Sequence, residues 1–364
     1  MSATALSSRQ PDRAQAPRPT LTPAPRRILV KELNWLGDLV LSLPTVRAIR
    51  RTWPSAQLAV LVKQELAGFF DGEDSVDEVI PYAIARGFRG IRDRARIVAQ
   101  IRVRRFDLAV MFPKSFGSAL LPALARVPRR AGYSADARSM LLTLKAPPPH
   151  DARSGHQANY WLAMVRETLG IEGATDDTAI APHQGHRSKM QEWLAAVRMR
   201  PQARLVALAP FAAYGPAKEW PAPKWARLID LLANRDGTEC MLVGTASERE
   251  RCAEVVAATR TGAIIAAGET GVGQLIALLS LADVVIGNDS GATHLGGALG
   301  IPTVGIFGST DPAWSAPLGP RTAVVYRKVE CSPCYAPTCR FGHHRCLEEL
   351  EVEAVARAAD SFHA

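Results

Sequence analysis

Four consecutive residues near the C-terminal end of the chain combine side chains and backbone groups that suit an anion. They are Asn288, Asp289, Ser290 and Gly291. This turn follows an apolar strand predicted over 283–287 and opens a small-residue helix predicted over 290–299, so it lies at the carboxyl edge of a parallel sheet. The first N–H groups of a helix are unpaired and carry the positive end of its dipole. The pattern therefore predicts a phosphate site, although an ordinary helix N-cap would use the same residue types.

A second polar turn follows the first apolar run of the chain. Gly37 and Asp38 stand between a strand predicted over 27–32 and a helix predicted to reach about Arg51. They are also expected at the edge where α/β sheets bind ligands. The glycine fingerprint G-x-G-x-x-G is missing, which argues against an NAD(P)-dependent oxidoreductase. By position alone, Asp38 is either a functional carboxylate or one that only pairs with the helix dipole.

Strands and helices alternate along the whole chain, which is typical of an α/β fold. The predicted division is a disordered tail over 1–26, an N-terminal Rossmann-like domain over 27–175, a linker over 176–202, a C-terminal Rossmann-like domain over 203–345 with a cysteine-rich loop over 331–346, and a C-terminal helix over 346–364. Two α/β domains in tandem leave a cleft between them, and such clefts are a usual place for a ligand.

The composition is that of a soluble globular protein. With 364 residues, 47% of them hydrophobic and 22% charged, the chain is long enough for two domains of about 150 residues each. No apolar run approaches the roughly 20 residues of a membrane-spanning helix. The N-terminus lacks the continuous apolar core of a signal peptide, so the sequence predicts a cytoplasmic protein.

The formal charge of +9 favours anionic partners. Arginines concentrate between Arg86 and Arg105, within a basic amphipathic helix predicted over 84–104. This helix is either a crossover helix with a solvated face or one that lies against an anionic membrane surface. Nucleic acid is a weaker alternative, because aromatic residues make up only 6% of the chain and none forms a stacking platform among the arginines.

Four cysteines with two neighbouring histidines suggest a second chemistry. The cysteines are Cys331, Cys334, Cys339 and Cys346, and the histidines are His343 and His344. Such residues bind zinc or an iron–sulfur cluster, but the spacing does not form two matched C-x2-C knuckles. Reduced thiols in a surface loop are the alternative, and a disulfide is not expected in the cytoplasm.

Three stretches of the sequence resemble glycosyltransferase family 9, the lipopolysaccharide heptosyltransferases. They are ILVKELNWLGDLVLSLPTVRAIRRTWPSAQLAVLV, PFAAYGPAKEWP and NDSGATHLGGALGIPTVGIFGSTDP, and they occur in order between about residues 27 and 326. Within this family, MFPKSFGSALLPALARVPRRAGY and GPAKEWP look more like heptosyltransferase II than I.

The resemblance implies a GT-B fold, in which two Rossmann-like domains face each other across a cleft. It also implies an inverting transfer of L-glycero-D-manno-heptose from ADP-heptose to the inner-core heptose of a lipid A-linked acceptor. The expected partners are thus ADP-heptose, this acceptor and the cytoplasmic face of the inner membrane, without nucleic acid. A family 9 transferase that acts at another core position, or with a related sugar nucleotide, is the alternative.

The resemblance also assigns roles to residues. Asp38 matches the family's GD motif and is the expected catalytic base, while Lys218 matches its phosphate-binding lysine. Asp289 is expected to accept hydrogen bonds from heptose hydroxyls, and the N–H groups of Ser290 and Gly291 are expected to bind the diphosphate.

The remaining assignments concern the nucleotide and the absence of a metal. An acidic residue after a strand commonly binds ribose in Rossmann-like domains, which points to Glu248 or, alternatively, Glu250. Glu269 and Thr270 are expected to line the adenine pocket. His294 is either a partner behind the donor-binding residues or an ordinary helix histidine. Because the chain has no D-x-D motif, no obligatory metal or other cofactor is expected.

Overall fold

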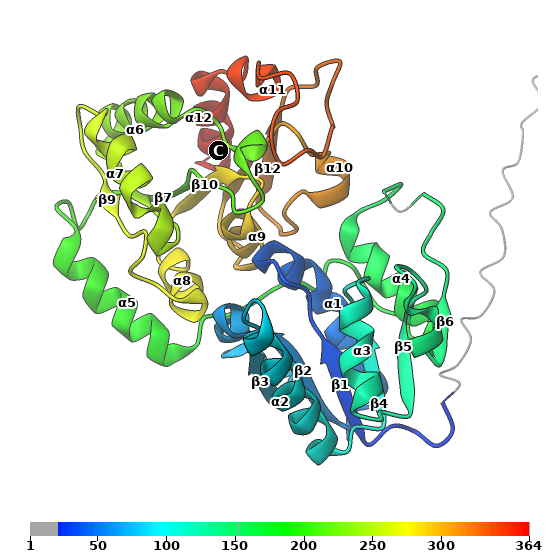
Figure 1. The fold of residues 1–364 in the computed structure, drawn as a ribbon. Helices are drawn as coiled ribbons and strands as arrows, with labels where there is room; N and C mark the ends of the chain where they lie inside the picture. The colour runs from blue at the N-terminus through cyan, green and yellow to red at the C-terminus, as the bar shows by residue number, and fades with distance from the viewer. Residues whose placement is uncertain (1–20, 152, 364) are drawn as a thin grey trace, which may run out of the picture.

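The computed structural model describes residues 21–151 and 153–363. Most of the tail predicted over 1–26 therefore lies outside the described residues. Two sheets organise the rest of the chain, one in each half (Figure 1).

The N-terminal half contains one parallel sheet of six strands in the order β3-β2-β1-β4-β5-β6. The strands are β1 (Arg27–Lys31), β2 (Gln57–Lys63), β3 (Glu78–Tyr82), β4 (Leu108–Met111), β5 (Arg129–Tyr133) and β6 (Leu144–Ala146). Helices α1 (Leu36–Thr52) and α4 (Gln157–Leu169) pack on one face. Helices α2 (Phe88–Arg104) and α3 (Phe116–Leu124) pack on the other face. Because both faces are covered, the central strands are almost continuously apolar.

The C-terminal half contains a second parallel sheet of six strands, in the order β12-β11-β10-β7-β8-β9. The strands are β7 (Leu205–Ala209), β8 (Glu239–Leu242), β9 (Ile264–Ile265), β10 (Val284–Asn288), β11 (Thr303–Phe307) and β12 (Thr322–Tyr326). One face is covered by α6 (Ala222–Asp236), α7 (Arg249–Ala257) and α12 (Val352–Asp360). The other is covered by α8 (Val272–Leu279) and α9 (Gly291–Ala298).

Both sheets have the strand order of a doubly wound Rossmann-like fold. In such a sheet the connections leave in opposite directions from two adjacent central strands, and this opens a crevice at their carboxyl ends. The crevice lies between β1 and β4 in the first half and between β7 and β10 in the second. The α/β class predicted from the sequence, with two Rossmann-like units, is therefore confirmed.

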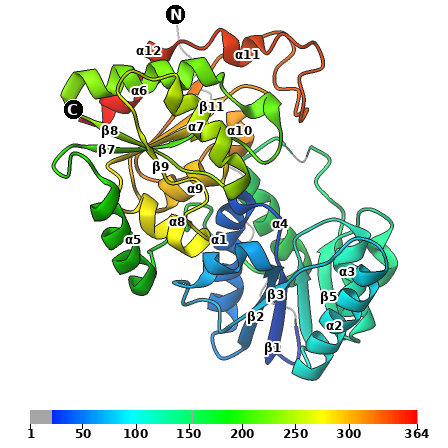
Figure 2. The ribbon, with the colours of Figure 1, turned by 60° about the vertical axis from the view of Figure 1, so that its left-hand side comes forward.

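The two halves meet through helices and share a hydrophobic core. Helix α1 contacts α9, and buried residues of α1, α8 and α9 belong to one cluster (Figures 1 and 2). Helix α5 (Gln184–Val197) lies within the range predicted as a linker and packs on α8. The domain boundaries themselves stay a prediction. Short elements complete the described fold: α10 (Pro312–Ser315), α11 (Arg345–Glu348), and the 3-10 turns η1 (Gln64–Phe70), η2 (Arg138–Leu141), η3 (Pro216–Lys218), η4 (Ala246–Glu248) and η5 (Ser361–His363).

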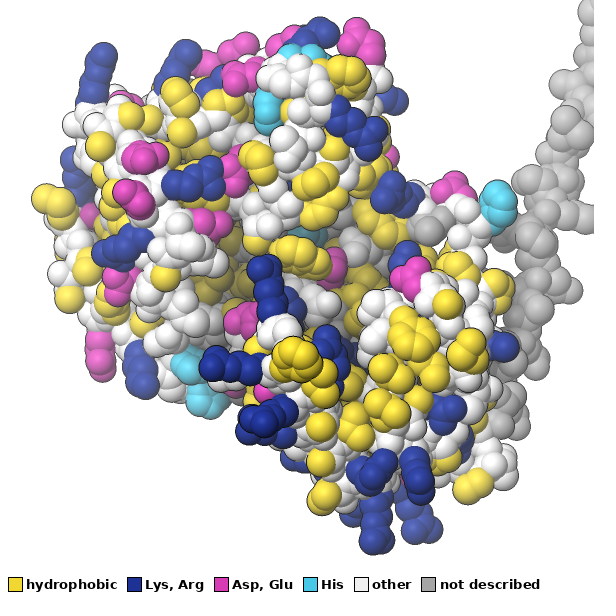
Figure 3. Space-filling view, viewed as in Figure 1, with side chains coloured by type: hydrophobic (Ala, Val, Ile, Leu, Met, Phe, Trp, Pro, Cys, Tyr) yellow, Lys and Arg dark blue, Asp and Glu magenta, His cyan; other side chains and the backbone are white. Residues whose placement is uncertain are grey.

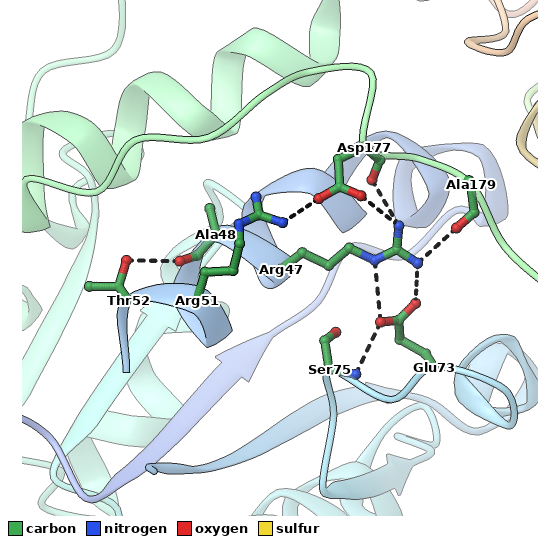
Figure 4. A network of polar contacts seen from close by, with 8 residues as sticks. All are labelled: Arg47, Ala48, Arg51, Thr52, Glu73, Ser75, Asp177 and Ala179. Atoms are coloured by element: carbon green, nitrogen blue, oxygen red, sulfur yellow. Dashed lines mark hydrogen bonds and ion pairs between the residues drawn. The ribbon is translucent and has the colours of Figure 1, made fainter. Parts of the chain in front are cut away.

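The linker between the halves is held by an arginine of α1. Arg47 donates to both carboxylate oxygens of Glu73, at 3.3 and 2.6 Å, and forms an ion pair of 2.9 Å with Asp177 (Figure 4). It also donates to the carbonyl of Ala179 at 2.8 Å. The next residue of the linker, Ile180, donates its N–H to the carbonyl of Ala298 at the end of α9. The linker is thus fixed to a helix of each half.

Two local predictions differ from the structure. Strand β6 has no counterpart among the predicted strands, because its three residues are too short for a recognisable pattern. The basic helix starts at Phe88 and not at Ile84, after Gly87 adopts a positive φ of 67° that favours glycine. Phe88 and Ile91 are 89% and 60% exposed, so the predicted apolar face is buried only towards the C-terminal end of the helix.

Candidate active site

Asp38 lies in the first turn of α1, just beyond the carboxyl end of β1. Its Oδ1 accepts a hydrogen bond of 2.8 Å from Nε2 of Gln157, the first residue of α4. Burial raises the pKa of Asp38, while the Gln157 hydrogen bond and the nearby His294 and Lys218 lower it without cancelling that effect. The carboxylate is therefore more basic than an exposed aspartate. It also lies within electrostatic reach of residues from the C-terminal half.

Lys218 lies at the end of η3, in the loop that follows β7. Its side chain is largely buried, and Nζ lies 2.5 Å from Oδ2 of Asp289. Nζ also lies 5.0 Å from the ring centroid of Tyr214, a cation–π distance. The lysine predicted from the sequence is thus a buried, paired cation at the carboxyl end of a central strand.

Asp289 follows β10 and is buried. Its Oδ2 accepts a hydrogen bond of 2.7 Å from Thr310 in addition to the lysine contact, and its Oδ1 lies 3.7 Å from Nε2 of His294. Burial alone would raise the pKa of Asp289, but His294 and the charge of Lys218 outweigh it and lower the pKa to about 2. One oxygen is therefore occupied by protein donors, and hydrogen bonding of this carboxylate to a sugar hydroxyl stays a prediction.

The start of α9 faces the start of α1. Ser290 is the N-cap of α9, and its buried hydroxyl oxygen has no hydrogen-bond partner in the described part of the chain. A Cβ atom on Gly291 would lie 2.8 Å from Cβ of Leu36, and one on Gly37 would lie 2.6 Å from Cδ2 of His294. Two helix N-termini, each with unpaired N–H groups, therefore converge beside Lys218. This combination suits a polyanion such as a diphosphate.

His294 is buried and touches both halves of the molecule. It lies within reach of Asp289 in its own half and of Gly37 across the gap. Its Nδ1 has no partner among the described residues, so the histidine is not fully hydrogen-bonded by the protein. Its place behind the donor-binding residues stays a prediction.

The residues predicted to bind the nucleoside lie on two adjoining loops farther along the same sheet edge. Gly268 donates its N–H to the carbonyl of Gly244, which brings the loops after β8 and β9 together. Glu248 accepts hydrogen bonds from the N–H and hydroxyl of Thr245, and Glu269 pairs with Arg249 at 2.6 Å. Both carboxylates thus have protein partners. The predicted roles of Glu248, Glu269 and Thr270 stay untested, as does the alternative Glu250.

Sequence reasoning missed three residues of this site. Thr310 follows β11, so the strand-end rule that singled out Asp289 could have identified it. Tyr214 lies in the loop that carries Lys218 and could have been selected as an aromatic neighbour. Gln157 begins a helix 119 residues away from Asp38, and no local pattern announces their contact.

Two Rossmann-like halves, with a carboxylate from one and a lysine–aspartate pair from the other at their meeting point, have the architecture of the GT-B class. The chain belongs to glycosyltransferase family 9 (heptosyltransferase), whose sequence model matches residues 94–345. This confirms the family and the enzyme class predicted from the sequence, and the two Rossmann-like halves confirm the predicted GT-B fold.

The relatives that the chain resembles extend over nearly its whole length. It is 29% identical to lipopolysaccharide heptosyltransferase 2 of Salmonella typhimurium (strain LT2), over 92% of this chain and 98% of that one. Its structure is similar to that of Escherichia coli ADP-heptose lipopolysaccharide heptosyltransferase II, with a TM-score of 0.77, 24% identity, and coverage of 93% of this chain and 100% of that one. A glycosyltransferase family 9 structure from Veillonella parvula gives a TM-score of 0.78, with 21% identity and coverage of 92% and 96%.

Proposed function

We propose that this enzyme transfers L-glycero-D-manno-heptose from ADP-heptose to the inner-core heptose of a lipopolysaccharide acceptor, with inversion at the anomeric carbon. The observation that carries the proposal is the meeting of Asp38 with the Lys218–Asp289 pair across the two halves. The relatives named lipopolysaccharide heptosyltransferase 2 support the choice of sugar and acceptor.

The two sides of the site divide the reaction between them. Asp38 takes the proton of the acceptor hydroxyl as the hydroxyl oxygen bonds to the anomeric carbon of the heptose. The bond from that carbon to the β-phosphate oxygen breaks, and ADP leaves with the electron pair. A positioned general base typically contributes about 10²- to 10⁴-fold to such a rate. The raised pKa of Asp38 suits this role, because it makes the carboxylate a better proton acceptor at neutral pH.

Positive charge on the C-terminal side stabilises the departing ADP. An ammonium group has three donors, so Lys218 can keep Asp289 and still bind phosphate oxygens. The N–H groups at the start of α9 and the free hydroxyl of Ser290 add further donors. Donors that are fixed before the charge develops give the largest electrostatic stabilisation. These groups can fill the role that a divalent cation plays in other nucleotide-sugar enzymes, so no obligatory catalytic metal is proposed.

The test is product analysis with ADP-heptose and a truncated core acceptor. Wild-type enzyme is expected to form the heptosylated product, and to do so in EDTA. Asp38→Asn keeps the shape of the side chain but removes its basicity, so turnover should fall about 10²- to 10⁴-fold while ADP affinity changes little. Near-normal turnover of this variant would show that Asp38 is not the base. Activity that depends on added Mg²⁺ or Mn²⁺ would contradict the mechanism without a catalytic metal.

Contact with the cytoplasmic face of the inner membrane is the second part of the proposal. Among the helices of the described residues, none has the length and apolar character needed to cross a bilayer. Helix α2 and the residues on either side of it instead present seven exposed arginines, which are Arg86, Arg89, Arg92, Arg94, Arg96, Arg102 and Arg105. Phe88 and Ile91 are exposed beside them, and Figure 3 shows basic and hydrophobic side chains intermingled over the N-terminal half. The six cysteines are free, which fits a reducing compartment.

Vesicle co-sedimentation tests this contact. The enzyme is expected to bind phosphatidylglycerol vesicles and not phosphatidylcholine vesicles, with binding that weakens as salt rises. Phe88→Ser/Ile91→Ser should reduce binding because the inserted apolar area is lost. The matched control is Met199→Ser. Met199 is as exposed as Phe88 but lies far from α2 along the chain, just beyond α5. Equal binding to both kinds of vesicle, or equal loss in the control, would contradict the proposal.

A further inference from the structure

Four thiols and two imidazoles that are separated along the sequence line one small cavity in the C-terminal half. They belong to Cys331, Cys334, Cys339, Cys346, His343 and His344. The four cysteines are free, and the sulfur of Cys331 lies 3.9 Å from Nε2 of His343. Thiolate and imidazole ligands of this kind favour Zn²⁺ among the common divalent cations.

The backbone that follows Cys339 forms a tight turn. The N–H of Gly342 is donated to the carbonyl of Cys339 at 3.3 Å. The turn depends on positive φ angles of 69° at Gly342 and 45° at His344. Within the described residues, no three metal-binding side chains are already grouped as ligands of one ion. Binding therefore requires the thiols to rotate towards the centre of the cavity that they line.

The segment that carries these residues is long for a loop without its own helix or strand. It runs over residues 327–344, between β12 and α11. Loops longer than about 12–15 residues that lack secondary structure are uncommon in compact domains unless they are functional. A bound ion would join distant points of this segment, as structural zinc does in small loop-rich domains.

The same segment holds two loops of the proposed active site. The carbonyl of Pro337 accepts the N–H of Ala217 at 3.0 Å, and a Cβ on Gly215 would lie 2.4 Å from that carbonyl oxygen. Gly215 and Ala217 belong to the loop that carries Lys218. On the other side, the carbonyl of Ser309 accepts the N–H groups of Cys334 and Tyr335 at 3.0 and 2.8 Å. Ser309 precedes Thr310, which donates to Asp289.

We propose that Cys331, Cys334, Cys339 and Cys346 bind one structural Zn²⁺, and that this ion braces the loops that position Lys218 and Thr310 for the donor diphosphate. The role of the ion in holding the donor-site loops rests on the proposed function, whereas the existence of the metal site does not. The ion is not assigned a catalytic role, because the contacts of the cysteine segment with the donor-site loops are made by its backbone carbonyls and N–H groups, at Ala217, at Ser309 and with the hydroxyl of Tyr214.

The experiment begins with metal analysis of the full chain, purified without chelators. About one zinc per chain is expected. Cys339→Ser should lower the metal content severalfold, whereas Cys252→Ala should not, because Cys252 is buried in the core of the C-terminal half. If Cys339→Ser does not fold, Co²⁺ added to the metal-free wild-type chain provides the second measurement. It should produce Co²⁺–thiolate absorption, and Zn²⁺ should protect four of the six thiols from a thiol reagent.

The outcomes distinguish the existence of the zinc site from its effect on the loops that carry Lys218 and Thr310. A wild-type chain without bound metal, and without Co²⁺–thiolate absorption, would overturn the site. Stoichiometric iron in place of zinc would overturn the zinc assignment. With the site established, removal of the metal should weaken ADP binding severalfold while the circular dichroism of the chain is retained. Unchanged ADP affinity would overturn the brace, and neither result depends on whether the transferred sugar is heptose.

Discussion

Two carboxylates of this site, the partly buried Asp38 and the buried Asp289, have pKa values that shift in opposite directions. Burial acts on both, but Asp38 has one neutral donor, Gln157, whereas Asp289 has the cation Lys218 and the nearby His294. The pKa of Asp38 is therefore raised and that of Asp289 is lowered to about 2. Carboxylates whose environments separate their pKa values in this way commonly take different roles. Asp38 suits proton transfer, and Asp289 suits a permanent anion that holds the lysine.

Gln157→Leu should displace the pH profile of the reaction. The hydrogen bond from Gln157 favours the charged form of Asp38, so its loss raises the pKa of Asp38 further. The base works only when ionised, and the rate falls as pH falls through its pKa. The acidic limb of kcat/KM should thus move to higher pH, while kcat on the plateau changes less. Gln184→Leu is the control, because Gln184 is also the first residue of a helix but is exposed. An unmoved limb would show that Gln157 does not tune the base.

The sequence allowed prediction of those site residues whose position follows from a strand end. Asp38, Lys218 and Asp289 each come shortly after a buried strand, and parallel strands bring such residues to one edge. Gln157 could not be predicted this way, because its contact with Asp38 depends on how α4 packs beside α1. The pairing of Lys218 with Asp289 was not predicted either. It needs the adjacency of β7 and β10, which is a property of the sheet and not of either segment.

At the scale of elements, the site depends on the close approach of two helix ends. The neighbour at the start of α9 is Leu36 of α1. Periodicity was a weaker guide for α2. Its apolar residues recur at helical spacing, but Phe88 and Ile91 are exposed. Spacing shows which residues share a helix face and does not show whether the sheet extends far enough to cover that face.

Gly291→Ala should impair transfer more than stability. The added Cβ would lie 2.8 Å from Cβ of Leu36, so the starts of α9 and α1 must separate by several tenths of an ångström. Misplacing the phosphate donors relative to Asp38 should lower kcat/KM about tenfold or more. Gly117→Ala is the matched control, because Gly117 is also near the start of a helix and a Cβ there meets nothing within 4 Å. This control should be neutral or slightly stabilising. Equal activity of the two variants would show that the helix ends tolerate separation.

At the scale of the whole molecule, two identical strand orders place two crevices opposite each other. The switch point of the first sheet presents Asp38, and that of the second presents Lys218 and Asp289. Neither half contains the complete site. The relative position of the halves is therefore as important as the fold of each, and it is set by the core shared by α1, α8 and α9 and by the linker. Apart from the short strand β6, the order of the strands could be predicted from the chain, but this relative position could not.

Arg47→Ala should loosen the connection between the halves. The guanidinium joins α1 to Glu73 and to the linker residues Asp177 and Ala179 (Figure 4). Its removal leaves Glu73 nearly buried without its cation, which should cost about 2 kcal/mol of the free energy of unfolding. Linker amides such as that of Ile180 should then exchange hydrogen faster, and KM for ADP-heptose should rise.

Arg51→Ala provides the comparison for this last variant. Arg51 is one helical turn further along α1 and pairs with the same Asp177 at 2.5 Å, but its side chain is 53% exposed. An exposed pair contributes at most about 1 kcal/mol, so this variant should keep near-normal exchange and KM. If Arg47→Ala destabilises the chain but leaves linker exchange and KM unchanged, Arg47 stabilises only the N-terminal half. If both variants behave alike, the linker is held by Asp177 alone, and the contacts of Arg47 with Glu73 and Ala179 do not set the position of the two halves.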